Sequence, residues 1–186
     1  KALQSVEAVF GLDFSYGPAD GFDVVRDAQR LLLDLARETK GVIWDEETRE
    51  CFAPDAWDEE RVSGWSEGLP YLPSHFVIHQ YRTGELTREI TLGMAKFGLP
   101  DVVVNDISGG DARSMASLVN LTCQTLAEKG RLDRPGTLLV DVQDHDFDFL
   151  AGLHDLGRVD VLVGPVHLGD VHQALDAILD LDERAV

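Results

Sequence analysis

Long apolar runs, basic residues and cysteines are scarce in this chain of 186 residues, and each shortage excludes a class of protein. No apolar stretch reaches the ~18–20 residues that a transmembrane helix requires. Sixteen Lys and Arg against 34 Asp and Glu give a net charge of −18 at neutral pH. Binding to a DNA or RNA backbone, or to an anionic membrane surface, needs clustered basic side chains. We therefore expect neither nucleic acid nor membrane among the partners.

The two cysteines, Cys51 and Cys123, have the spacing of neither a redox pair nor a zinc site. Each has apolar neighbours in the sequence, which is typical of a buried, reduced thiol. The N-terminal residues lack the basic-then-apolar pattern of a signal peptide. These features predict a cytoplasmic location. The first residue is Lys1 rather than Met, from which we expect a native protein that extends upstream.

The apolar fraction of 44% is that of an ordinary globular protein, so the acidity does not mark a disordered chain. The length fits a single domain, at ~100–200 residues per domain. A strand–helix–strand pattern over residues 6–45 has a weak echo over 101–142. We therefore expect one α+β domain over residues 1–186, within which 1–90 and 91–186 can be two related halves.

Apolar periodicity predicts the individual elements. A period of two predicts a half-buried strand over residues 6–14. A spacing of three and four predicts a helix that begins near Asp20 or Asp23, as a cap, and ends at Lys40 and Gly41. Its apolar stripe consists of Val24, Ala28, Leu31, Leu32 and Leu35. The other expected strands are 41–45, 75–81, 86–92, 101–105, 137–142 and 159–163, and the other helical segments are 55–61, 93–97, 111–129 and 170–181. Hairpins and crossovers together predict a mixed, largely antiparallel sheet with helices packed mainly on one face.

Three further patterns have plain structural interpretations. The Gly-rich stretch 106–111 lacks the spacing of a nucleotide-binding loop and is typical of a tight turn. His75 and His79 would lie ~13 Å apart in a strand, too far to share one metal ion, and we expect both to be half-buried or at a sheet edge. The tryptophans Trp44, Trp57 and Trp65 are typical of core anchors, although lining a groove stays open.

The acidic run from Asp141 to Asp148 follows an expected strand. Carboxylates and an imidazole at a strand end can bind a divalent cation, although the run lacks the EF-hand spacing and a solvated surface stays open. The candidate metal ligands are Asp141, Asp144, His145 and Asp146, to which His167 and His172 can be added in space. Residues 141–186 contain 11 acidic and 2 basic residues, so half of the net charge lies in the last quarter of the chain.

One segment resembles a known family. Residues 91–102, Thr-Leu-Gly-Met-Ala-Lys-Phe-Gly-Leu-Pro-Asp-Val, resemble a Thr-x-Gly-Met-x-Lys-Phe-Gly-Leu-Pro-Asp stretch in uncharacterised bacterial proteins built from domains of unknown function. Two other segments are also similar to segments of those proteins: Gly41-Val42-Ile43-Trp44-Asp45, and the spacing of Trp57, Arg61 and Trp65. The resemblance covers about half of the chain. It implies a bacterial, cytoplasmic α+β domain, which can be the N-terminal part of a longer protein, and it implies no catalytic residue.

Two functions of different classes remain. The sequence favours a non-catalytic, acidic protein-binding or regulatory module without a cofactor, because no complete catalytic signature is present; an immunity-type inhibitor of a basic toxin is one form. Its partner would be a basic protein. The expected protein-binding residues are Asp144, Asp146, Asp148, Asp170, Asp176 and Asp180. The alternative is a metal-assisted hydrolase that uses the acidic run from Asp141 to Asp146. Small-molecule binding between the sheet and residues 46–74 also stays open, as does the oligomeric state.

Overall fold

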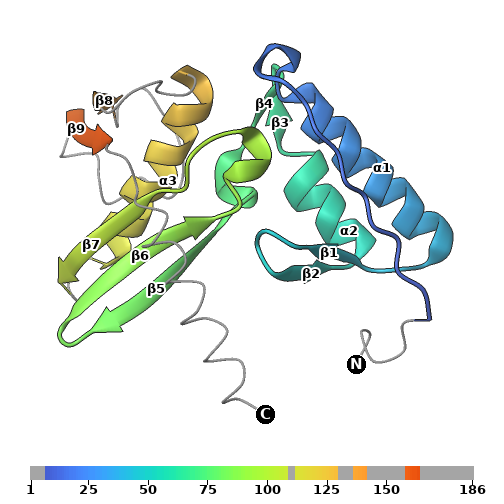
Figure 1. Ribbon diagram of the computed structural model, residues 1–186, viewed down its shortest axis with the longest axis horizontal. Helices are drawn as coiled ribbons and strands as arrows, with labels where there is room; N and C mark the ends of the chain where they lie inside the picture. Colours follow the sequence, from blue (N-terminus) through green and yellow to red (C-terminus); the bar gives the residue numbers. More distant parts are fainter. Residues whose placement is uncertain (1–6, 109–111, 130–135, 142–157, 164–186) are drawn as a thin grey trace.

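The computed structural model describes residues 7–108, 112–129, 136–141 and 158–163, which form an α+β fold (Figure 1). Within these residues the strands pair antiparallel in four small sheets. The largest has the order β5-β6-β7, formed by β5 (Val77–Thr83), β6 (Leu86–Leu92) and β7 (Val103–Ser108). The fold class is therefore the one that the sequence predicts.

The hairpin β5–β6 and the helix α3 (Ala112–Lys129) form one side of the molecule. The main core contains Leu121, Cys123 and Leu126 of α3, and Ile78 and Val104 of the sheet pack against it. The same core continues to Val25 of α1. The expected strands 75–81 and 86–92 and the expected helix 111–129 are thus confirmed within about two residues. A separate hairpin follows α3, formed by β8 (Gly136–Asp141) and β9 (Arg158–Val163).

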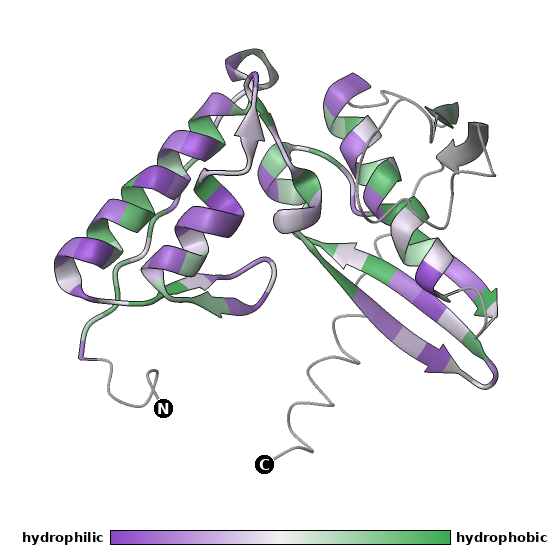
Figure 2. Ribbon diagram, turned by 180° about the vertical axis from the view of Figure 1, so that it is seen from behind, coloured by the Kyte–Doolittle hydropathy of each residue, from purple (hydrophilic) through white to green (hydrophobic). Residues whose placement is uncertain are grey.

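The other side of the molecule is built on α1 (Asp23–Thr39), which shows alternating hydrophilic and hydrophobic bands in Figure 2. Its buried residues are Val25, Gln29, Leu33 and Ala36. The buried face of α1 is therefore rotated about the helix axis relative to the expected apolar stripe. Four residues of that stripe are half-buried at the border of the buried face: Val24, Ala28, Leu32 and Leu35. Leu31 is 48% exposed, so the prediction that it belongs to the buried face was wrong.

The ends of α1 also differ from expectation. The N-cap is Phe22, which makes no side-chain cap, whereas Asp20 accepts a hydrogen bond from the Gly17 backbone N–H at 2.7 Å and closes the short turn η2 (Pro18–Asp20). At the other end Lys40, not Gly41, takes the left-handed conformation, with φ +56°. The Gly41 N–H then donates to Ala36 at 2.9 Å, as in a Schellman motif.

Short elements lie beside α1 or between the two sides. They are β1 (Ile43–Asp45), β2 (Glu50–Phe52), α2 (Pro54–Trp57), the π-helical turn η3 (Asp58–Val62), β3 (Trp65–Ser66), β4 (Leu69–Pro70), η4 (Leu72–Ser74) and η5 (Ala95–Phe97). A second core lies under α1, where Leu33 packs with Ile43, Phe52 and Trp57. None of the described helices has the length and apolar character that crossing a membrane would require.

The expected strand over residues 6–14 is wrong for every residue of it that the structure describes. Residues 7–17 form neither helix nor strand and run alongside α1 in both views (Figures 1 and 2). Val9 is 85% exposed and Phe10 is 73% exposed. A period of two specifies two faces of an extended chain but supplies no neighbouring strand. The proposed echo between residues 6–45 and 101–142 consequently lacks its first strand.

Two smaller expectations fail as well. Asp106 and Ser108 belong to β7 rather than to a turn, and Asp106 has a positive φ of +59° beside an irregularity in the β6–β7 register. Residues 109–111 lie outside the described chain. Cys123 is buried as expected, but Cys51 is exposed because it points outward from the short hairpin β1–β2.

Candidate functional site

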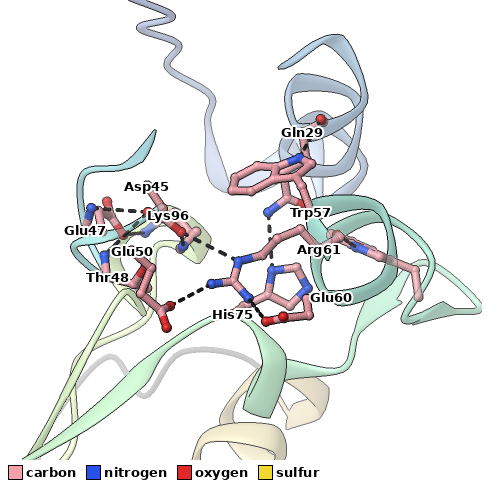
Figure 3. A network of polar contacts seen from close by, with 11 residues as sticks. Gln29, Asp45, Glu47, Thr48, Glu50, Trp57, Glu60, Arg61, His75 and Lys96 are labelled. Atoms are coloured by element: carbon pink, nitrogen blue, oxygen red, sulfur yellow. Dashed lines mark hydrogen bonds and ion pairs between the residues drawn. The ribbon is translucent and has the colours of Figure 1, made fainter. Parts of the chain in front are cut away.

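The three segments named in the resemblance meet at one buried cluster of charges (Figure 3). Asp45 ends the Gly41–Asp45 segment, Arg61 lies between the two tryptophans, and Lys96 lies in the segment of residues 91–102. Asp45 is 8% exposed and Arg61 is 1% exposed. Buried ionised groups are rare unless they are paired, so this cluster is the most unusual feature of the described residues.

Asp45 is the centre of the cluster. Its Oδ2 accepts a hydrogen bond from Lys96 Nζ at 2.7 Å and forms an ion pair with Arg61 Nε at 3.6 Å. Its Oδ1 accepts from the backbone N–H groups of Glu47 and Thr48, at 3.2 and 3.4 Å. Burial alone would raise the pKa of Asp45, but the Lys96 ammonium, the Arg61 guanidinium and the Thr48 N–H together hold it below its usual value. The carboxylate is therefore ionised at neutral pH.

Arg61 is presented by the π-helical turn η3, a geometry that is frequent at functional sites. Its guanidinium forms ion pairs with Glu50 at 3.1 Å and with Glu60 at 3.5 Å. The same group lies over the Phe52 ring, 4.5 Å from the centroid, and 5.8 Å from that of Trp57. These contacts fix the guanidinium in place and leave it no room to reach a ligand.

The segment of residues 91–102 forms a tight turn that carries Lys96. Asp101 Oδ1 accepts from Thr91 Oγ1 at 3.0 Å and from the Met94 N–H at 3.3 Å, and Thr91 Oγ1 accepts from the Val102 N–H at 2.8 Å. A Cβ on Gly93 would lie 2.8 Å from the His75 carbonyl oxygen, so only glycine fits there. The turn is thus specified by its own residues, and it fixes the position of Lys96.

His75 lies behind the charge cluster and is fully buried. Its Nδ1 is 3.2 Å from Gln29 Nε2, and the rings of Trp65 and Phe97 contact it edge-on. Burial, followed by the positive charges of Arg61 and Lys96, lowers the pKa of His75 to about 3. The imidazole is therefore neutral at physiological pH and enclosed, which makes it unsuited to general acid–base catalysis.

A groove of about 870 Å³ opens beside the cluster, between residues 12–17, α1, the end of β1 and η5. Its walls are largely apolar and aromatic. They include Leu12, Phe14, Phe22, Leu32, Trp44 and Phe97. Four acidic residues also line the groove, against one basic residue, Lys96. The acidic ones are Asp13, Asp45, Glu46 and Glu47.

Several contacts hold the walls of the groove. The Tyr16 hydroxyl donates to the Lys96 carbonyl oxygen at 2.6 Å, which fastens the N-terminal segment to η5. Trp44 is 45% exposed, and its indole N–H donates to Glu46 Oε2 at 2.6 Å. Glu47 accepts a hydrogen bond from the Lys96 backbone N–H at 3.1 Å, and burial raises the pKa of its carboxyl. The groove therefore combines an accessible aromatic ring with carboxylates, which suits a cationic side chain.

Most of the residues that the sequence singled out lie elsewhere. Asp141 is the last residue of β8, and its backbone pairs with Arg158. Outside the described residues lie Asp144, His145, Asp146, Asp148, His167, Asp170, His172, Asp176 and Asp180. The acidic protein-binding surface and the alternative metal site therefore remain predictions. Across the part of the chain that the structure describes, no group of three or more side chains is placed to hold a metal ion.

His75, His79 and the three tryptophans lie within the described residues. His75 precedes β5 and is fully buried, not half-buried in a strand, whereas His79 is half-buried on β5. Trp57 and Trp65 are core anchors, as expected. Trp44 instead lines the groove, which is the alternative that the sequence left open. Sequence reasoning missed Asp45, Arg61 and Lys96 of the cluster, whose only signal was their place in the resembling segments. It also missed the groove carboxylates of Asp13, Glu46 and Glu47.

Comparison with protein-family models, with curated proteins and with solved structures finds no match to this chain.

Proposed function

We propose that this chain is a non-catalytic protein-binding module whose groove holds a basic, partly apolar segment of a partner protein. The observation that carries the proposal is the lining of the groove, in which carboxylates border an apolar, aromatic surface. A Lys or Arg side chain matches that surface, because its aliphatic stem packs on apolar walls while its charged end pairs with a carboxylate. An immunity-type inhibitor of a basic toxin would be one such module.

The reactive groups near the groove support binding rather than catalysis. Lys96 and Asp45 neutralise each other at 2.7 Å, and His75 is enclosed and neutral. A catalytic pair would need a nucleophile or base with access to a substrate. The cluster instead holds β1 and η5 together, and so fixes two walls of the groove.

The charge of the whole chain supports a basic partner as well. A net charge of −18 creates a field that attracts basic proteins and accelerates their association. That attraction is screened over ~8 Å at physiological ionic strength, so the affinity should fall as salt is added. The acidic residues from Asp144 to Asp180 would contribute to the field, whereas the groove would supply specificity.

Synthetic peptides of about 12 residues test the proposal, one alternating Lys with Val and two others in which Glu or Gln replaces Lys. Calorimetry gives the affinity, and the fluorescence of the exposed Trp44 reports occupancy of the groove. We expect the Lys peptide to bind, the Gln peptide to bind more weakly and the Glu peptide not to bind. Equal affinities for the three peptides, or an affinity that salt leaves unchanged, would refute the proposal.

Two variants with the same change in charge separate the groove from the general field. The triple variant D13N/E46Q/E47Q removes three carboxylates that line the groove. The control D27N/D34N/D55N removes three exposed carboxylates that do not line it. We expect the first to weaken binding of the Lys peptide about tenfold and the second to weaken it less than about threefold. Equal losses would mean that the groove has no special role.

A further inference from the structure

Residues 7–13 have the pattern of a strand, but none of the strands that the structure describes pairs with them. Val9 and Phe10 are among the most exposed apolar side chains of the described chain. None of the backbone hydrogen bonds between described residues involves residues 7–16. A chain segment with an alternating pattern and unpaired backbone N–H and C=O groups is a template for another strand.

The segment is nevertheless held at one end. Tyr16 is anchored by its hydroxyl, and its ring stacks with that of Phe14 at a centroid distance of 6.3 Å. Leu12 and Phe14 line the groove, so residues 7–11 lead directly into it. Ordering a segment that is already anchored costs less conformational entropy than ordering a free tail.

We propose that residues 7–13 bind the partner segment by β-strand addition, so that the partner supplies an extended strand in which basic and apolar side chains alternate. This inference rests on the function proposed above. Backbone hydrogen bonds to residues 7–13 would supply affinity, and the groove beyond Leu12 would receive a basic side chain from the end of the added strand.

Charge disfavours two other occupants of the segment, a second copy of the chain and its own C-terminal residues. A second copy that paired antiparallel around Phe10 would place Glu7 opposite Asp13, and like charges directly opposite each other are destabilising. Each copy also has a net charge of −18. The chain's own residues 164–186 contain five acidic residues and one basic residue, so the same repulsion applies to them. A basic strand from another protein has the complementary charge.

Gly11 allows a direct test. A Cβ added there would meet no atom within 4 Å, and the residue does not have a positive φ, so neither Ala nor Pro would clash at the Cβ position. Gly11→Pro removes one backbone N–H and places a ring against an incoming strand, whereas Gly11→Ala keeps the N–H. We expect G11P to weaken binding of the Lys–Val peptide about tenfold and G11A to change it less than about twofold. Amide hydrogen exchange should show alternate amides of residues 8–12 becoming protected when the peptide is added.

The outcomes separate the two proposals. If G11P and G11A bind equally and the amides stay unprotected, while binding still depends on Asp13, Glu46 and Glu47, strand addition is wrong and the proposed function stands. If none of the peptides binds, the proposed function fails and strand addition fails with it. If sedimentation shows that the protein dimerises and that G11P abolishes the dimer, a second copy is the occupant and the proposal is overturned.

Discussion

Mild acid should destabilise this protein through His75. The imidazole is fully buried and has a pKa of about 3 in the folded state, against ~6.5 in an unfolded chain. Between these values the unfolded state binds one more proton than the folded state. The free energy of unfolding therefore falls as the pH falls below ~6.5, and the loss continues down to the folded-state pKa.

The size of the loss follows from proton linkage. Full titration of one such group costs ~1.4 kcal/mol per pH unit, so His75 contributes a loss of ~1.2 kcal/mol between pH 7 and 5.5, and ~2.5 kcal/mol by pH 4.5. A small domain has a total stability of only ~5–15 kcal/mol, which makes this loss measurable. The window from pH 7 to 5.5 is the cleaner one. Burial raises the pKa of Glu47 and of Asp101, and protonation of those carboxyls at lower pH acts in the opposite direction.

Urea unfolding at pH 7, 6.5, 6 and 5.5 measures the slope, and His75→Asn removes the titrating group. The Asn side-chain oxygen can still accept a hydrogen bond from Gln29 Nε2, which lies 3.2 Å from the imidazole nitrogen. We expect the variant to be less stable at pH 7 but to lose ~1 kcal/mol less than the parent between pH 7 and 5.5. His79→Asn, on the half-buried edge of β5, serves as the control and should change the slope less. Parallel slopes for the parent and His75→Asn would show that His75 is not the neutral, enclosed group described above.

Two further predictions concern the charge cluster and the turn beside it. Asp45→Asn leaves two buried cations, Lys96 and Arg61, without their shared carboxylate and should cost ~3–5 kcal/mol in urea unfolding; Lys96→Met should cost less, because Asp45 keeps Arg61 and two backbone N–H groups. A larger cost for Lys96→Met would contradict this account of the cluster. Gly93→Ala should lower the melting temperature more than Gly98→Ala, because both residues have a positive φ but only Gly93 has a neighbouring atom 2.8 Å from an added Cβ. Equal shifts in melting temperature would show that the close approach to His75 is unimportant.

The elements that the sequence predicted well are specified by neighbouring residues. The turn at Gly84 places two strands of matching length in one hairpin, with Val77 opposite Leu92 and Thr83 opposite Leu86. The α3 helix spans 18 residues, and its Met115, Leu118, Val119, Thr122 and Leu126 recur at intervals of three or four residues. Both signals are local, so neither depends on where distant parts of the chain lie.

Two of the failures depend on a distant partner. Gln29 occupies the centre of the buried face of α1, because its amide contacts His75, which lies 46 positions further along the chain. An apolar stripe cannot reveal a polar residue at its centre, so the expected face was displaced toward Leu31. Similarly, residues 7–14 have the pattern of a strand, but the described chain offers them no strand with which to pair.

The candidate site was unpredictable for the same reason. Asp45 and Lys96 are 51 positions apart, and no spacing rule connects them. In a chain with 34 acidic residues, nothing but its place in a resembling segment distinguishes the Asp45 carboxylate in the sequence. What distinguishes it is burial between two cations, which is a property of the folded state alone.

The charge cluster and the groove have different roles, and this separates what maintains the fold from what would select a partner. The side-chain oxygens of Thr91 and Asp101 form hydrogen bonds within the turn, and the Lys96 ammonium donates to Asp45. A protein that carries the Thr-x-Gly-Met-x-Lys-Phe-Gly-Leu-Pro-Asp segment should therefore form the same turn whatever it binds. Specificity would then depend on residues such as Asp13 and Trp44, which the turn and the cluster hold in position but which could change without breaking either.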